Sequence, residues 1–235
     1  ILDAMISDGR DFDDVLKEAQ ALGYAEANPS ADIDGLDTAR KTAISSSIAF
    51  DTIIKEENVS VFGLRNIKKA DIDYIKAKLN KTVRYLGFGA KNNGTVSAFV
   101  EPTILGFDTL EANVYKNFNM ITLFGEGVGR LSFYGQGAGK YPTGIALAQD
   151  MIDIAEGDTA LSYAPDAVEV DNGACKRKYF IRTTADMPFE FYDSVDKIDD
   201  VYYIVTKEIS VSAMHEAADL MLEQDADSFF AGFEY

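Results

Sequence analysis

Apolar residues recur at helical spacing in three stretches of the first third of the chain. Residues three or four positions apart share one face of a helix, so this spacing predicts helices that pack one side against a core. Asp11 stands before the first stretch as an N-cap, and Gly23 follows it as a stop. The apolar positions are Phe12, Val15, Leu16, Ala19 and Leu22 in the first helix, Leu36, Ala39, Ala43, Ile44, Ile48 and Ala49 in the second, and Ile72, Ile75 and Leu79 in a third from Ala70 to Leu79.

The middle of the chain has a different pattern, with short runs rich in β-branched and aromatic residues. Glycine, asparagine and proline bound these runs, which is typical of strands. A mixed β-sheet flanked by helices is the simplest assembly of such elements, so the pattern predicts an α/β fold. The predicted strands are Val83 to Ala90, Thr95 to Val100, Met120 to Phe124 and Gly129 to Tyr134.

Helical spacing returns from Thr143 to Ala155, directly after Pro142, which suits a helix start. Residues 157–172 then read as a loop, and we expect a first domain over residues 1–170 and a second over residues 173–235. The second domain is predicted to be a small α/β module. Its elements are two strands, Lys178 to Thr183 and Tyr202 to Thr206, a helix from Val211 to Leu222, and a last strand from Ser228 to Tyr235.

Composition and charge narrow the classes of partner. The chain has 235 residues, of which 47% are hydrophobic, enough to bury a sizeable core. Its formal net charge of −17 argues against nucleic acid, which needs clustered lysine and arginine. The single cysteine excludes an internal disulfide, and no apolar run is long enough to span a membrane. We therefore expect a cytoplasmic protein with no membrane contact.

The candidate chemistry lies between Gly23 and Lys41, where four carboxylates precede one amine. Asp37 and Lys41 are four positions apart and share a helix face. An ammonium among carboxylates can bind a zwitterionic amino acid and transfer a proton. The alternative is a solvated capping loop with a surface ion pair, which spacing alone favours because acidic residues are common at helix starts. The other three carboxylates are Glu26, Asp32 and Asp34.

Other motifs fail when they are checked residue by residue. The glycines at 125, 127 and 129 meet Arg130 where a dinucleotide fingerprint needs glycine, and those at 135, 137 and 139 meet Lys140. A phosphate-binding Walker loop fails as well, because Tyr134 occupies its first glycine position. The acidic segment does not follow a calcium-loop pattern, and His215 has no second histidine for a triad. No metal site is predicted.

Two separate segments together resemble a known family. YAEANP from Tyr24 to Pro29, DIDGLD from Asp32 to Asp37, and Lys41 resemble the substrate-site segment of homoserine dehydrogenases. FYGQGAGKYPT, from Phe133 to Thr143, resembles the glycine turn before the last helix of their substrate domain. The resemblance covers residues 1 to about 155 and implies reduction of L-aspartate 4-semialdehyde to L-homoserine with NADH or NADPH, on the route to threonine and methionine.

The resemblance also implies roles for individual residues. Lys41 would donate the proton, with Asp37 beside it as an orienting partner. Glu26, Asp32 and Tyr24 would bind the substrate, and Gly139 would approach the cofactor near its nicotinamide. Asn28 departs from the family, which commonly has aspartate before this proline.

Further expectations concern the rest of the protein. The family places a Rossmann domain before this region, so we expect this sequence to be a fragment that is inactive alone. The tail after Lys176 resembles a shortened ACT regulatory domain, and the family implies a homodimer or tetramer. Two alternatives stay open: a non-catalytic amino-acid-binding or regulatory module, and a platform for oligomerisation.

Overall fold

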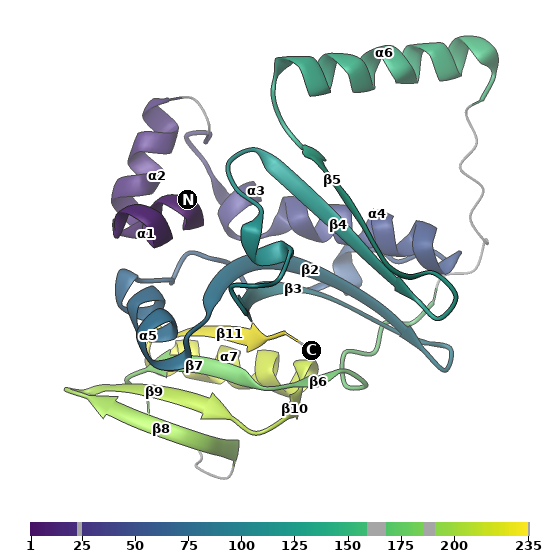
Figure 1. Cartoon of the computed structure of the whole chain (residues 1–235). Helices are drawn as coiled ribbons and strands as arrows, with labels where there is room; N and C mark the ends of the chain where they lie inside the picture. The colour runs from purple at the N-terminus through teal and green to yellow at the C-terminus, as the bar shows by residue number, and fades with distance from the viewer. Residues whose placement is uncertain (23–24, 159–167, 186–190, 235) are drawn as a thin grey trace. The chain divides into compact units, whose positions relative to one another are not determined.

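The computed structural model describes residues 1–22, 25–158, 168–185 and 191–234. The chain forms two compact units (Figure 1). One unit combines Ile1–Phe107 with Tyr163–Tyr235, and the other is Asp108–Ser162. The larger unit contains both ends of the chain.

A mixed sheet forms the centre of the larger unit. Within the described residues it has seven strands, in the order β1-β3-β11-β7-β9-β8, and β2 also pairs with β3. β1 and β11 run parallel to β3, and the other neighbours are antiparallel. The strands are β1 (Ser60–Val61), β2 (Thr82–Asn92), β3 (Thr95–Leu105), β7 (Tyr179–Thr183), β8 (Tyr192–Ile198), β9 (Val201–Thr206) and β11 (Phe229–Phe233).

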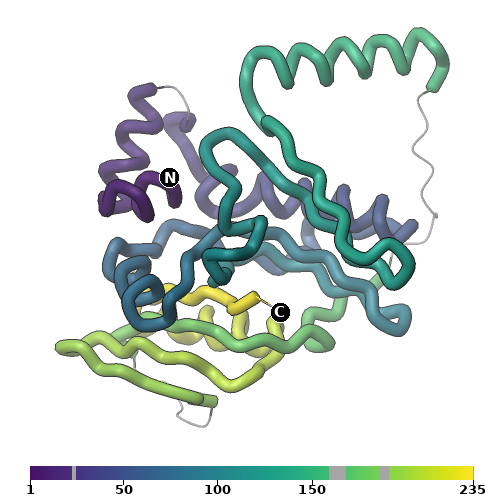
Figure 2. Tube along the Cα trace, viewed as in Figure 1, coloured from purple at the N-terminus to yellow at the C-terminus, as the bar shows by residue number. Residues whose placement is uncertain are grey.

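The long strand β3 pairs with strands from the N-terminal part of the chain and with a strand from its tail. β2 pairs with it along its whole length, from Thr82 opposite Leu105 to Asn92 opposite Thr95. β1 pairs with Phe99 and Val100, and β11 pairs with residues 103 and 104. Because β2 occupies one edge of β3, β1 and β11 follow one another along the other edge. Figure 2 shows the yellow C-terminal strand beside the blue β3, so the tail continues the sheet.

Helices cover both faces of this sheet. Alternate residues of a strand point to opposite faces, so Phe229 and Ala231 join a core with residues of α1, α2 and α5, whereas Phe230 packs against residues of α7. A third cluster packs Ala39 and Ala43 of α4 against Val100 and neighbouring residues of β3. The helices are α1 (Leu2–Asp8), α2 (Phe12–Ala21), α3 (Ser30–Ile33), α4 (Leu36–Phe50), α5 (Lys69–Leu79) and α7 (Val211–Gln224), with a 3₁₀ turn at Glu56–Asn58 and a small pair of strands, β6 (Lys176–Arg177) and β10 (Ile209–Ser210).

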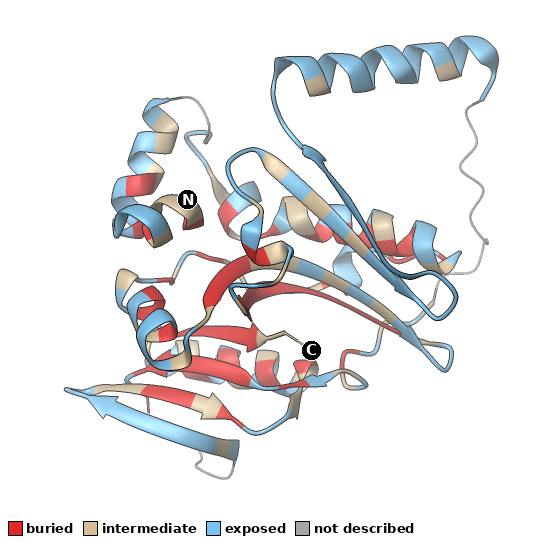
Figure 3. Cartoon of the chain, in the orientation of Figure 1, coloured by how far each residue is buried: buried red, intermediate tan, exposed pale blue. Residues whose placement is uncertain are grey.

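The smaller unit is a hairpin followed by a helix. β4 (Phe118–Gly125) and β5 (Gly129–Gln136) pair antiparallel, and α6 (Lys140–Glu156) comes next, with a 3₁₀ turn at Glu111–Asn113 before the hairpin. Most of its described residues are exposed, and α6 has no buried residue (Figure 3). Several exposed side chains are large and apolar, among them Phe124, Phe133, Tyr141, Ile145 and Met151.

The predicted α/β class with a mixed sheet is confirmed, but one strand was missed and one expectation about a helix face is wrong. β8 was not predicted, because its sequence YDSVDKI is mostly polar and its pairing with β9 decides its conformation. The apolar stripe of α4 does not face the sheet as a whole: Ile44 and Ile48 are 56% and 52% exposed, whereas Thr42, Ser46 and Ser47 are buried. The division into domains of residues 1–170 and 173–235 stays a prediction.

Candidate functional site

The acidic segment enters α4 through a turn at Gly35. Gly35 caps the helix with a φ of 84° and is buried. A Cβ atom there would overlap the hydroxyl of Tyr85 and lie 2.8 Å from Cγ1 of Val61. Only glycine combines this left-handed backbone with such a close approach. The start of α4 is therefore seated directly on the sheet.

Asp37 and Lys41 form an ion pair on the exposed side of α4. Lys41 Nζ lies 2.8 Å from Asp37 Oδ2, and the two side chains are 64% and 45% exposed. Asp37 lies in the first helical turn, where the helix dipole favours a negative charge. The predicted pairing is present, and the amine remains open to solvent and to a ligand.

The opposite side of α4 is built from small polar residues. Thr42 and Ser46 occupy the space that side chains would take at Gly87 and Gly89 of β2. Thr42 donates through Oγ1 to the Thr38 carbonyl at 2.8 Å, so its hydroxyl is satisfied within the helix. These short side chains allow α4 to pack close to β2.

Asp32 lies on the short helix α3, beside a groove. Its side chain is exposed, while the next residue, Ile33, is 2% exposed and anchors the helix in the core. The groove has a volume of about 390 Å³. Lys41 and Glu26 are not among its lining residues, which are Ile1, Leu2, Asp3, Ala19, Ala25, Pro29, Asp32, Ile33 and Leu64.

Glu26 lies on the loop before α3 and is exposed. Its carbonyl accepts a hydrogen bond from Gln20 Nε2 at 3.0 Å, which ties the loop to α2. Asn28, the departure from the family pattern, accepts from the Ser30 amide through Oδ1 at 3.3 Å. Tyr24, the other predicted substrate residue in this loop, lies outside the described residues.

Asp34, the remaining carboxylate, is held by an arginine that the sequence did not point to. Arg65 donates from Nε and Nη2 to the two carboxylate oxygens of Asp34, at 2.9 and 2.8 Å. The Arg65 guanidinium holds the pKa of Asp34 below its ordinary value of 3.8. Asp34 is therefore engaged in holding α3 in place and is less available to a ligand than Asp32.

Gly139 lies in the smaller unit, as the N-cap of α6. Its φ of 124° is a conformation that side chains rarely adopt. The nearest atoms to a Cβ placed there are Pro142 Cδ at 3.7 Å and Asn117 Nδ2 at 3.9 Å. The positive φ, rather than a lack of space, is thus what favours glycine at this turn.

The structure pairs Asp37 with Lys41 and places Asp32 beside a groove in the same unit. The roles of these residues, and of Glu26 and Gly139, stay predictions. Among the described residues, no group of three or more His, Cys, Asp and Glu side chains could hold a metal ion. No helix in that part of the chain has the length and hydropathy to cross a membrane.

Sequence reasoning missed the residues that support the site. Arg65 was not singled out, because the segment Phe62 to Ile67 has no periodic pattern and its ion pair spans 31 residues. Gly63 was missed for the same reason: a Cβ there would come within 2.8 Å of the Ile33 carbonyl oxygen. The sequence offered only the residue types of Gly63 and Arg65, between β1 and α5, as signals of these contacts.

Comparison with known proteins gives one consistent result. Residues 1–152 match the family model described as homoserine dehydrogenase. The homoserine dehydrogenase of Pseudomonas aeruginosa is 35% identical over 79% of this chain and 45% of its own length. That of Corynebacterium glutamicum is 42% identical over 70% of this chain and 38% of its own length. The chain therefore spans less than half the length of these curated relatives.

Solved structures agree with the sequence comparisons. A homoserine dehydrogenase from Thiobacillus denitrificans matches 99% of this chain and 61% of its own, with a TM-score of 0.81 and 27% identity. A hyperthermophilic archaeal homoserine dehydrogenase mutant in complex with NADPH matches 67% of this chain and 44% of its own, with a TM-score of 0.53 and 25% identity.

Proposed function

The chain belongs to the homoserine dehydrogenase family, and we propose that it supplies the substrate-binding and proton-transfer part of such an enzyme. The reaction would be the reduction of L-aspartate 4-semialdehyde to L-homoserine, in threonine and methionine biosynthesis. The curated relatives are more than twice as long as the matched region. This chain by itself is therefore proposed to be inactive, and the activity belongs to the longer protein.

The observation that carries this proposal is the Asp37–Lys41 pair. Lys41 Nζ is exposed and lies 2.8 Å from one carboxylate oxygen. The Lys41 ammonium is the group that can donate a proton, and the Asp37 carboxylate beside it is its hydrogen-bonding partner. In the reductive direction Lys41 donates this proton to the aldehyde oxygen, which becomes the hydroxyl of homoserine. Asp37 restricts the direction of the ammonium.

The neighbouring acids would recognise the amino acid. Asp32 and Glu26 are exposed carboxylates on the segment that leads into α4. They are suited to bind the substrate ammonium group or its hydroxyl by charge-assisted hydrogen bonds. Tyr24 is proposed to contact the substrate from the same loop.

The cofactor would be NAD or NADP. When bound, its reduced nicotinamide supplies the hydride that reaches the aldehyde carbon. Gly139 is proposed to approach the cofactor, since a glycine leaves its backbone free of a side chain of its own and the neighbouring Pro142 and Asn117 make only van der Waals contacts there. The residues that read the ribose would lie in a nucleotide-binding domain outside this sequence. We also propose a cytoplasmic homodimer or tetramer.

Mutation of Lys41 in the full-length protein tests the function. We expect Lys41→Ala to lower kcat by about 10² to 10⁴, the usual cost of losing a positioned proton donor. Arg40→Ala is the matched control, because Arg40 is an exposed cation on the same helix that pairs with Glu56 instead. We expect it to stay within about threefold of the wild type. Equal turnover in the wild type and Lys41→Ala would remove Lys41 from the mechanism.

A second candidate function is an amino-acid-binding or regulatory module. The observation in its favour is the tail, in which β11, β7, β9 and β8 form an antiparallel sheet with α7 packed on one face. This arrangement supports the expected ACT-like module. Residues 184–191 alone separate β7 from β8 in the sequence, which fits the expectation that the module is shortened. Calorimetry of the full-length protein with homoserine, threonine and NADPH separates the two candidates. Threonine binding without turnover or a response to homoserine would favour the regulatory module.

A further inference from the structure

A short segment between β1 and α5 contacts both the acidic segment and the C-terminal tail. This segment, residues 63–66, is called the strap below. Its neighbours on one side are Ser30 to Asp34, and on the other side Arg182 and the turn at residues 226–228. These two partners are far apart in the sequence, so the strap is where they are linked.

Toward the site, the strap holds α3 by its backbone and by one side chain. The Leu64 amide donates to the Ile33 carbonyl at 2.7 Å. Arg65 makes its two hydrogen bonds to Asp34 and a third, at 3.3 Å, to Ser30 Oγ. These contacts fix both ends of α3, the helix that carries Asp32.

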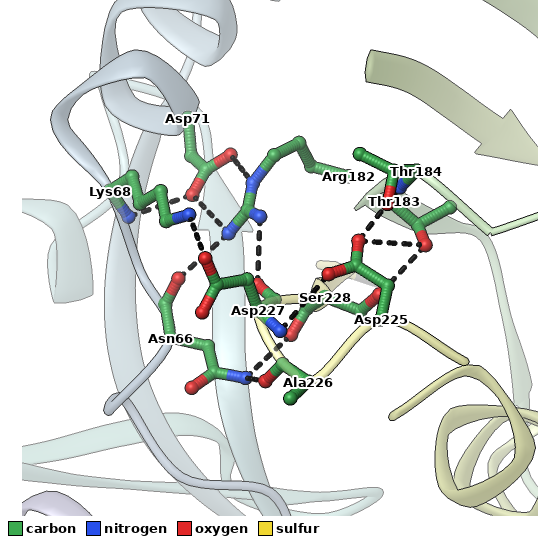
Figure 4. A network of polar contacts seen from close by, with 10 residues as sticks. All are labelled: Asn66, Lys68, Asp71, Arg182, Thr183, Thr184, Asp225, Ala226, Asp227 and Ser228. Carbon is green, nitrogen blue, oxygen red and sulfur yellow. Dashed lines mark hydrogen bonds and ion pairs between the residues drawn. The ribbon is translucent and has the colours of Figure 1, made fainter. Parts of the chain in front are cut away.

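Toward the tail, the next residue of the strap makes three hydrogen bonds (Figure 4). Asn66 Nδ2 donates to the carbonyls of Ala226 and Ser228, at 2.8 and 2.9 Å. Its own carbonyl accepts from Arg182 Nη2 at 2.7 Å. Arg182 is in turn fixed by Asp71, at 2.8 Å. Asn66, the neighbour of Arg65 in the chain, is therefore hydrogen-bonded to two segments of the tail, Arg182 and the turn at residues 226–228.

We propose that Arg65 and Asn66 are positioning residues through which the C-terminal tail holds the acidic segment in its substrate-binding geometry. Arg65 and Asn66 share one planar peptide unit, so a shift of the Asn66 backbone displaces the backbone of Arg65 as well. A displacement of the tail at Arg182 or residues 226–228 therefore moves Asn66, and with it Arg65 and α3. The tail is thereby connected through the strap to α3, the helix that carries Asp32. The effect of this connection on catalysis rests on the proposed function.

The competing explanation is that these contacts stabilise the fold without affecting the site. The two explanations differ in what Asn66 does, because its hydrogen bonds run to the tail and it has none to α3 among those described. Loss of its side chain should disturb the tail in either case. It should disturb residues 30–36 only if the strap transmits the change.

Hydrogen exchange of the full-length protein tests the link directly. We expect Asn66→Ala and Arg65→Gln each to speed amide exchange in residues 30–36 by about three- to tenfold. Lys178→Gln is the control, since it removes an exposed tail ion pair with Asp193 at 2.6 Å that does not involve the strap. Faster exchange at residues 225–228 but not at 30–36 in Asn66→Ala would overturn the proposal.

Steady-state kinetics supply a second readout. For both variants we expect KM for the amino-acid substrate to rise about three- to tenfold, with kcat and the KM for nicotinamide nucleotide within about twofold. Arg65→Lys should recover only part of the loss, because lysine keeps the charge but not the planar fork. An unchanged substrate KM in both variants would also overturn the proposal. If the wild type has no dehydrogenase activity, the proposed function fails, and hydrogen exchange still decides the link.

Discussion

Arg182 on β7 forms an ion pair with Asp71, in the first turn of α5, and both side chains are almost fully buried. Arg182 Nε lies 2.8 Å from Asp71 Oδ1, and the two side chains are 5% and 0% exposed. The other carboxylate oxygen accepts from the Lys68 amide at 2.8 Å, and Arg182 Nη1 donates to the Asp227 carbonyl at 2.7 Å. One buried pair therefore joins the N-terminal part of the sheet unit to its tail (Figure 4).

Removing one member of this pair should be costly. We expect Asp71→Ala to lower the free energy of unfolding by about 3 to 5 kcal/mol, because it leaves the Arg182 charge buried without its carboxylate. Urea unfolding followed by circular dichroism measures the change. Lys178→Gln, which breaks an exposed pair, should cost less than about 1 kcal/mol. Equal losses in the two variants would contradict the buried role of Asp71.

A side chain at Gly35 should strain the entrance to α4. We expect Gly35→Ala to lower the free energy of unfolding by about 2 to 4 kcal/mol, from the positive φ and the overlap with the Tyr85 hydroxyl. Adding Tyr85→Phe should recover part of this loss, since it removes the overlapping oxygen and leaves the backbone strain. A double-mutant cycle of thermal unfolding measures the recovery. Strictly additive effects would mean that the hydroxyl is not the obstacle.

The Asp34–Arg65 pair should contribute stability in a pH-dependent way. The Arg65 hydrogen bonds lower the pKa of Asp34 in the folded state, so the pair stabilises the fold above the ordinary pKa of 3.8 that applies to the unfolded chain. Its contribution is lost as the pH falls through the lowered pKa. Near neutral pH we expect Asp34→Asn to cost about 0.2 to 1 kcal/mol, because solvent screens this partly exposed pair.

Urea unfolding at a series of pH values from neutral to strongly acidic measures this dependence. The difference between the wild type and Asp34→Asn should shrink to zero below the lowered pKa. Arg65→Gln should follow the same profile, because it removes the cause of the shift. A difference that stays constant with pH would show that Asp34 acts through packing or capping instead.

Substitutions on the two faces of α4 should differ in how much they change the free energy of unfolding. Ile44 and Ile48 are exposed, so we expect Ile44→Gln and Ile48→Gln to change the free energy of unfolding of this chain by less than about 0.5 kcal/mol. Ala43 is buried against the sheet, and Ala43→Leu should cost about 1 to 3 kcal/mol by overpacking. Urea unfolding compares the three variants. A larger loss of unfolding free energy in the isoleucine variants than in Ala43→Leu would show that Ile44 and Ile48 pack against the core, as the apolar spacing predicted.

Local pattern was sufficient for most of the elements and for the family. The helix predicted from Leu36 and the one predicted over Ala70 to Leu79 are present, because their apolar spacing and their end residues are local properties of the chain. The same holds for β2 and β3. Asp37 and Lys41 could be paired from their spacing alone, since a helix brings positions four apart to one face.

Tertiary structure decided what spacing cannot reach. β8 is a strand because it pairs with β9, although its own residues are mostly polar. The buried face of α4 is the one with Thr42 and Ser46, because glycines on β2 leave room only for short side chains. Arg65 and Asp34 meet across 31 residues, and Arg182 and Asp71 across 111. Such contacts depend on which distant segments the sheet brings together. Local propensity cannot predict them, because it depends only on residues that are near one another in the sequence.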